Sequence, residues 1–423
     1  MRMTRLLALV LLESAAFVHT GGAFVVAAVA LAGCARSGGE QQTDTAPAAV
    51  LPPIARALST GDRHVIALDA RGHIFAWGDN QRGQLGLART CTLPVPKLVD
   101  SSRSWRSVDA GTRASYAIAR DGALWRRGFP NWPDGDCAKD RKPLPYESLN
   151  WDGRWLKVQE SWGIATGIDA GGALQLWNDD EIRAEALRDI GGRTQAALVN
   201  AEPKKHWQDF CLAIHRVYAI ADDGSLWTNT LKTGMWDRVR ADQLAKLERV
   251  PGDAPPLARV FCHTNATHVL ALDAKGDLWG MGDDKFGELG DGDGDSFTQT
   301  QPVTQLKRVT KTRWNDIAVG SGFTIGLKTD GTLWAWGNNA HGNLGVGSYD
   351  YSDIPRAVDS DRPWASVAAG AGFAIGATRD AELFAWGENS GGVLGDGGSS
   401  NTHMAPARVY GQERWAVSAA GGN

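Results

Sequence analysis

The feature that most constrains the fold is a short turn motif that recurs at nearly constant spacing. In the clearest copies it reads Asp-Gly and separates two runs of alternating apolar residues, as in Ala318–Leu327 and Thr332–Trp336. Such alternation predicts strands with one buried face, and Asp-Gly between them predicts a β-hairpin. The last turn residues of the seven copies are Gly72, Gly122, Gly172, Gly224, Gly276, Gly331 and Ala381. Their successive separations of 50, 50, 52, 52, 55 and 50 residues indicate a repeat protein.

Tryptophan marks three more positions of the repeat, and the chain has 18 tryptophans and 51 glycines. One indole opens the first strand of a copy, at Trp105, Trp155, Trp207, Trp314, Trp364 and Trp415. Others follow the turn by three residues (Trp125, Trp227, Trp279, Trp334) or by five (Trp77, Trp177, Trp336, Trp386). Positions two apart face the same side of a strand, so we interpret these indoles as core between neighbouring sheets rather than as ligand-stacking groups.

Each copy predicts about four strands, the last with proline, as in Leu93–Pro96. One such sheet cannot bury both faces alone, whereas sheets arranged radially can pack on one another. We therefore predict an all-β, seven-bladed β-propeller over residues 54–423. A linear array is the alternative, but it would need polar end caps that the sequence does not show. Residues 415–421 repeat the opening strand without a hairpin, and residues 54–58 lack its tryptophan, so either segment could complete the first blade.

The N-terminus predicts export. Residues 1–33 combine Arg2 and Arg5 with a long apolar stretch and end in Leu-Ala-Gly before Cys34, which resembles a bacterial lipobox. We expect cleavage before Cys34, lipid attachment to it, and a flexible tether over residues 34–53. An uncleaved membrane anchor or a simple secretory signal remain alternatives. Lipid attachment predicts a location at the cell envelope. Because Ala35 follows the cysteine, the resemblance to other lipoproteins implies the outer membrane if two membranes are present.

Four copies share a loop after the third strand that resembles the regulator of chromosome condensation (RCC1) repeat, W-G-x-N-x-x-G-Q-L-G. They cover residues 77–86, 282–290, 337–345 and 386–395, whereas the second to fourth copies lack the motif. The resemblance implies a seven-bladed propeller of repeats of about 50 residues. The founding family member promotes nucleotide exchange on a nuclear GTPase, to which an exported protein has no access. Similar secreted bacterial propellers include one that inhibits a β-lactamase, which implies a protein partner.

Candidate binding residues come from the position eight residues before each turn residue and from its neighbours. Histidine, which this repeat often carries there, is replaced in other copies by alanine, isoleucine, arginine or phenylalanine. A hydrogen-bonded interior residue is one interpretation, and a recognition face is the other. The residues of the predicted face are Arg63, His64, Arg113, Trp162, His215, Arg216, Asn265, His268, Phe323 and Phe373.

No H-E-x-x-H, G-x-S-x-G or phosphate-binding loop is present. We expect no cofactor and no metal; a calcium-loop pattern at Asp291, Asp293 and Asp295 lacks the required glycine at Ser296 and the closing glutamate. The net charge of -4 argues against nucleic-acid binding. We therefore predict a non-catalytic binding scaffold for a protein partner. The alternative is an enzyme, a lyase or hydrolase, with a site built from loops on one face.

Four cysteines remain beyond the predicted lipidation site. They occupy equivalent positions in consecutive copies, which lie close together in a ring, and export favours oxidation. We expect pairs between Cys91 and Cys137 and between Cys211 and Cys262, with buried free thiols as the alternative.

Overall fold

The computed structural model describes residues 57–88, 90–128, 145–151, 153–179, 198–229, 239–293, 302–359, 361–411 and 415. The predicted signal peptide and tether, with Cys34, lie outside these residues, as do Cys137 and Asp295. The chain divides into the units Met1–Ala48 and Ala49–Asn423, and only the second is described below. Within the described part, no helix combines the length and apolar character needed to cross a bilayer.

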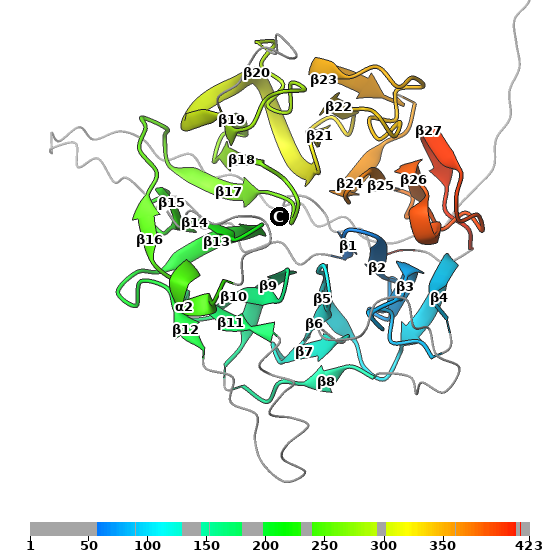
Figure 1. Ribbon diagram of the computed structural model, residues 1–423, viewed down its shortest axis with the longest axis horizontal. Helices are drawn as coiled ribbons and strands as arrows, with labels where there is room; N and C mark the ends of the chain where they lie inside the picture. Colours follow the sequence, from blue (N-terminus) through cyan, green and yellow to red (C-terminus); the bar gives the residue numbers. More distant parts are fainter. Residues whose placement is uncertain are drawn as a thin grey trace, which may run out of the picture. The chain divides into compact units, whose positions relative to one another are not determined.

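Antiparallel sheets are arranged around a common axis, and the first strand of each sheet lies nearest that axis (Figure 1). Five sheets have four strands and one has seven. In the seven-stranded sheet, the long β20 (Val303–Gly320) pairs with β19 through its first part and with β21 from Trp314 onward. Over the described residues we therefore number four-stranded units, called blades, from 1 to 7. The predicted all-β propeller fold is confirmed.

The strands of blades 1 to 4, each from the axis outward, are β1 (Leu58–Thr60), β2 (His64–Leu68), β3 (Ile74–Asp79) and β4 (Thr92–Asp100); β5 (Trp105–Ala110), β6 (Ser115–Ala119), β7 (Leu124–Arg127) and β8 (Glu147–Ser148); β9 (Trp155–Ser161), β10 (Ile164–Asp169), β11 (Leu174–Asn178) and β12 (Val199–Asn200); β13 (Trp207–Ala213), β14 (Arg216–Ala221), β15 (Leu226–Asn229) and β16 (Leu247–Arg249).

The remaining elements, besides β20, are β17 (Leu257–Phe261), β18 (His268–Asp273) and β19 (Asp277–Gly282) of blade 5; β21 (Phe323–Lys328), β22 (Leu333–Gly337) and β23 (Ser352–Val358) of blade 6; β24 (Trp364–Ala369), β25 (Phe373–Thr378), β26 (Leu383–Glu388) and β27 (Thr402–Arg408) of blade 7; the short helix α2 (Ala241–Leu244); and the 3₁₀ turn η1 (Ser390–Gly392).

The repeated turn joins each blade to the next. Gly72 has a φ of 82°, and a Cβ there would lie 2.9 Å from the carbonyl oxygen of Trp105, so glycine is required twice over. The Gly72 carbonyl in turn accepts the Trp105 N–H at 2.9 Å. The same bond recurs at every junction, in the pairs Trp155–Gly122, Trp207–Gly172, Leu257–Gly224, Trp314–Gly276, Trp364–Gly331 and Trp415–Ala381. Regular spacing of the turn therefore gives regular stacking of blades.

The predicted indole core is correct for two of the three tryptophan sets. The strand-opening tryptophans and those five residues past the turn are at most 6% exposed. The tryptophans that follow the turn by three residues are only half-buried, because they lie two residues closer to the turn than the buried set and therefore at the edge of the core. Cations cover several of these rings: Lys328 lies 3.5 Å from the centre of Trp334, and Arg103 lies 3.7 Å from that of Trp125.

Both ends of the described chain complete blade 1. β1 pairs with β2, while Trp415 forms an isolated antiparallel bridge with Asp69, at the place where Trp105 pairs in blade 2. The Trp415 ring packs edge-on against Phe75 at 5.2 Å between centroids. The Thr60 hydroxyl donates to the Ala369 carbonyl of blade 7 at 2.8 Å. The two segments that the sequence left as alternatives thus divide one strand position and close the ring.

Candidate protein-binding face

The two ends of the blades differ in chemistry. The repeated turns and blade junctions lie at one end, which we call the back face. The loops between the first and second strands of each blade, which we call the inner loops, lie at the other end, the front face. Their residues are 61–63, 111–114, 162–163, 214–215, 262–267, 321–322 and 370–372. The predicted binding residues all lie in these loops or immediately after them.

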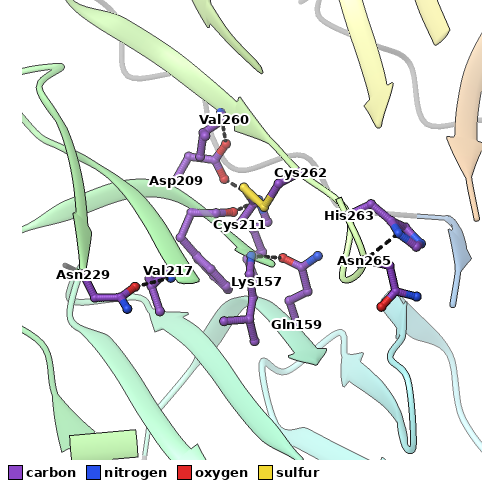
Figure 2. The surroundings of a disulfide bond; sticks show 12 residues. Lys157, Gln159, Asp209, Cys211, Val217, Asn229, Val260, Cys262, His263 and Asn265 are labelled. Atoms are coloured by element: carbon purple, nitrogen blue, oxygen red, sulfur yellow. Dashed lines mark hydrogen bonds and ion pairs between the residues drawn. A yellow bond between two sulfur atoms is a disulfide. The ribbon is translucent and has the colours of Figure 1, made fainter. Parts of the chain in front are cut away.

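The inner loop of blade 5, residues 262–267, is the longest and reaches other blades; we call it the central loop (Figure 2). The Thr264 hydroxyl donates to Asp62 of blade 1 at 2.8 Å. The Trp162 indole N–H of blade 3 donates to the side-chain oxygen of Asn265 at 3.1 Å, and Ser321 of blade 6 donates to the Asn265 carbonyl at 3.4 Å. One loop therefore ties together four blades on the front face.

His263 lies at the start of the central loop and is 4% exposed. Its Nδ1 accepts the Asn265 N–H at 3.2 Å, which leaves the proton on Nε2, and Nε2 faces Asp62 at 3.9 Å. Burial is the main cause that lowers the pKa of His263. The neutral ring therefore shapes the loop and is not a cation for a ligand.

A disulfide between Cys211 of β13 and Cys262 anchors the central loop, with the two Cα atoms 5.7 Å apart (Figure 2). This is one of the two predicted pairs. Side-chain bonds support it on both sides, since Gln159 accepts the Leu212 N–H at 2.9 Å and Asp209 accepts the Val260 N–H at 2.9 Å. Cys91 is also disulfide-bonded, and its predicted partner Cys137 lies outside the described residues.

The structure corrects the predicted face at four positions. His64, His268, Phe323 and Phe373 are at most 2% exposed, so they cannot contact a partner. Each begins a second strand and points between blades: His64 Nε2 lies 3.2 Å from the Ser115 hydroxyl, and His268 Nε2 lies 3.1 Å from the Thr324 hydroxyl. Burial lowers the pKa of His64 to about 4 and that of His268 to about 3. Alanine and isoleucine at the same repeat position were the signal that this site is interior.

The other six predicted residues remain accessible. Arg63 and Arg216 are exposed, and Arg113, Trp162, His215 and Asn265 are partly exposed. The Arg113 guanidinium lies 5.5 Å from the Trp162 ring centre. Sequence reasoning missed Asp62, His263 and Thr264. The available signal was the length of the central loop, six residues where blade 6 has only Ser321 and Gly322.

Glu160, beneath the inner loops, is fully buried and accepts bonds from the Gly163 N–H at 2.7 Å and the Arg113 N–H at 2.9 Å. Burial, with the nearby Asp179 carboxylate, raises the pKa of Glu160 to about 7. Asp179 itself accepts the Tyr116 hydroxyl and forms an ion pair with Arg126. These charged groups are enclosed by hydrogen bonds and an ion pair that hold blades 2 and 3 together. Their role is therefore structural.

The acidic loop with the calcium-loop pattern is described as far as Asp293, and a lysine of β20 pairs with it. The Lys307 ammonium lies against Asp291, and Asp291 also accepts the Asp293 N–H at 2.9 Å. Across the described residues, no three His, Cys, Asp or Glu side chains are placed to hold a metal ion together.

Comparison with known proteins identifies the repeat. The model of the regulator of chromosome condensation (RCC1) repeat matches residues 71–118 and 330–376, and a second model of that repeat matches residues 55–84 and 314–343. The chain is 26% identical over 327 residues to the regulator of chromosome condensation of Xenopus laevis, covering 68% of this chain and 72% of that protein. It is 24% identical over 308 residues to the ultraviolet-B receptor UVR8 of Arabidopsis thaliana, covering 72% of this chain and 57% of that one.

A third relative is the human E3 ubiquitin-protein ligase HERC2, 24% identical over 312 residues that cover 71% of this chain but only 5% of the ligase. Among solved structures, Prp20p of Saccharomyces cerevisiae superposes with a TM-score of 0.64 at 16% identity, covering 82% of this chain and 88% of Prp20p. The yeast protein bound to Kap60 superposes with a TM-score of 0.65 at 15% identity, covering 89% and 91%. These likenesses establish the propeller fold.

Proposed function

We propose, on the premise that this chain is a β-propeller carrying regulator of chromosome condensation repeats, that it is a non-catalytic scaffold that binds a protein partner at the cell envelope. The supporting observation is the front face. A closed ring holds seven inner loops at fixed positions, and the loops differ in length and side chains from blade to blade. Such a rigid surface with varied side chains suits recognition.

Protein binding is also described for two structural relatives. Prp20p has been characterised for its binding to Gsp1p and histones, and the yeast protein has been crystallised bound to Kap60. Those partners belong to those proteins. For this chain we propose only the shared property, namely a propeller that binds a protein.

The buried ionisable groups support the scaffold over the lyase or hydrolase alternative. Glu160 and His64 have strongly shifted pKa values, but loop backbone or a neighbouring hydroxyl engages each of them. A general acid or base must instead reach a substrate atom. These groups therefore hold the fold.

The envelope location rests on Cys34 and the apolar segment before it. Replacing Cys34→Ser should abolish metabolic labelling by a fatty acid and release the protein from the membrane fraction. Labelling that persists in the variant would refute lipid attachment at this residue.

Site-specific photo-crosslinking tests the binding function. A photoreactive amino acid at Thr267, which is exposed on the front face, should give one discrete protein adduct in intact cells. The same group at Arg71, exposed on the back face, is the matched control and should give none. No adduct from Thr267, or the same adduct from both sites, would contradict a front-face binding protein.

A further inference from the structure

We propose that one arc of the front face, formed by Arg63, Arg113, Trp162, His215 and Arg216, is the docking surface for an acidic segment of a protein partner. This inference rests on the proposed binding function and names the chemistry of the partner. We call these five residues the arginine arc.

The arginine arc comes from four successive blades. Blade 1 supplies Arg63, blade 2 supplies Arg113, blade 3 supplies Trp162, and blade 4 supplies the remaining two residues, all at or beside the inner loops. The opposite part of the ring differs, because the inner loops of blades 6 and 7 consist of serine, glycine and alanine over residues 321–322 and 370–372. The recognition chemistry is therefore gathered on one side of the axis.

The charge of the arc is opposite to that of the chain. The whole protein carries a net charge of -4, yet the arc holds three arginines. The carboxylates nearest the arc are engaged within the fold. Asp62 accepts a bond from Thr264 and faces His263, Asp79 near Arg63 accepts the Gln81 N–H, and Glu160 near Arg113 is fully buried. The loops farther from the axis carry both signs, for example Asp283 beside Lys285. Guanidinium groups pair with carboxylates through two parallel hydrogen bonds, so carboxylate side chains are the complementary ligand.

The backbone conformation of two arc residues is a second, independent indication that this surface is functional. Trp162 and His215 have φ values of 52° and 50°, in the left-handed region that favours glycine. The residue equivalent to His215 in blade 6 is Gly322, with a φ of 80°. A bulky side chain in this region costs about 1 kcal/mol, and such strain gathers at functional sites. The chain thus retains a side chain where glycine would be easier to accommodate.

Trp162 is held ready for contact by its neighbours. Its indole N–H is bonded to Asn265, and its backbone N–H donates to the Thr112 hydroxyl at 2.6 Å. A ring fixed before binding loses little entropy on docking, and tryptophan and arginine dominate the energetic centres of protein interfaces. The disulfide-anchored central loop therefore serves to orient the aromatic member of the arc.

Binding of defined peptides to the full-length mature lipoprotein in uncharged detergent tests the proposal. Three fluorescent ten-residue peptides alternate tyrosine with glutamate, glutamine or lysine. The glutamate peptide should bind at least tenfold more tightly than the other two, and its affinity should fall as salt rises. Arg63→Glu should weaken it about tenfold. Arg71→Glu, in the same blade but at the other end of β2, should change it less than twofold.

His215→Gly separates recognition from folding. It should leave the melting temperature unchanged or raised, because it removes backbone strain, while it weakens the glutamate peptide about threefold. A purely structural His215 would show no loss of binding. The proposal is overturned if the glutamine peptide binds as well, if Arg71→Glu weakens binding as much as Arg63→Glu, or if anionic lipid vesicles bind more tightly than the peptide.

The outcomes also separate this inference from the proposed function. A discrete photo-adduct that survives Arg63→Glu and Trp162→Gly would sustain a binding function and refute the arginine arc. Arc-dependent peptide binding without any adduct in cells would support the preference of the arc for carboxylates but refute a protein partner in the cell, and with it the proposed function.

Discussion

Asp284 breaks the pattern of the repeat at a buried position, and the variant Asp284→Asn should stabilise the protein. Blade 6 has Asn339 at this place, whose side-chain oxygen accepts the Leu344 N–H at 2.9 Å while its amide donates to the carbonyls of Ser348 and Asp350 at 2.8 and 2.9 Å. Asp284 keeps the first bond, from Leu289 at 2.9 Å. Its other oxygen has no hydrogen-bond donor within the part of the chain that the structure describes, although the residue is only 2% exposed.

The size of the effect follows from the pKa of Asp284. Burial, reinforced by the nearby Asp291 carboxylate, raises this pKa from 3.8 to about 6. A raised pKa means that the folded state prefers the protonated acid, so the free energy of unfolding falls as the pH rises from 3.8 to 6. The full cost above pH 6 is at most about 3 kcal/mol. Because water screens part of the charge, we expect a cost of about 1–2 kcal/mol.

Calorimetric melting at pH 5 and pH 8, with a chelator present, measures this effect. Asp284→Asn should raise the melting temperature by about 2 °C at pH 8, since a ring of this size has a large unfolding entropy. The gain should be smaller at pH 5, where the wild-type acid is largely protonated. Asn339→Asp is the reciprocal control in blade 6: it should destabilise the protein, and more strongly at pH 8 than at pH 5.

Two results would refute this reasoning. One is an Asp284→Asn variant that is no more stable than the wild type at pH 8. The other is a gain of equal size at both pH values, which would mean that the carboxylate charge is not the cause. Removing the charge also removes one cause that raises the pKa of Glu288 to about 7, and this acts in the same direction.

Three further variants test the closure and bracing of the ring. Trp415→Ala should lower the free energy of unfolding by about 3–5 kcal/mol, because Trp415 is 6% exposed and completes blade 1; Tyr410→Ala, 67% exposed, is the control and should change it little. Replacing both Cys211 and Cys262 by alanine should cost up to about 4 kcal/mol in chemical denaturation, from the loss of a cross-link across 51 residues, and no loss would contradict a bracing role. Asp179→Asn should cost about 3–5 kcal/mol by leaving Arg126 buried without its anion, and adding Arg126→Met should recover part of that loss.

The sequence predicted the parts of the fold that repeat. The turn recurs at a spacing of about 50 residues, and its carbonyl accepts the backbone N–H that opens the next strand, as between Gly72 and Trp105, so local pattern was enough. The core set five residues past the turn was predicted for the same reason. For His64, the interpretation as a hydrogen-bonded interior residue is correct and the recognition-face interpretation is wrong. The alanine and phenylalanine of other copies at this position indicated an interior site.

The parts that depend on contacts across the ring could not be predicted. The bond between Trp162 and Asn265 joins residues 103 apart in sequence, and that between Thr264 and Asp62 joins residues 202 apart. Nothing in the repeat period indicates which inner loop reaches over the axis. The sequence did indicate that β1 or the segment at Trp415 completes blade 1, but not that the two divide one strand position between them.

The difference between the two faces explains on which of them the sequence can differ from blade to blade. On the back face, the carbonyl of each repeated turn accepts a backbone N–H from the next blade, as Gly72 does from Trp105, so a change there disturbs the stacking of two blades. On the front face, the links between loops are bonds of particular side chains, such as Thr112 with Glu160 and Trp162 with Asn265. Such a link can change in one blade without altering the geometry of the others. A repeat protein can therefore acquire binding specificity on its front face while its back face keeps the ring closed, and the arginine arc lies on the face where this freedom exists.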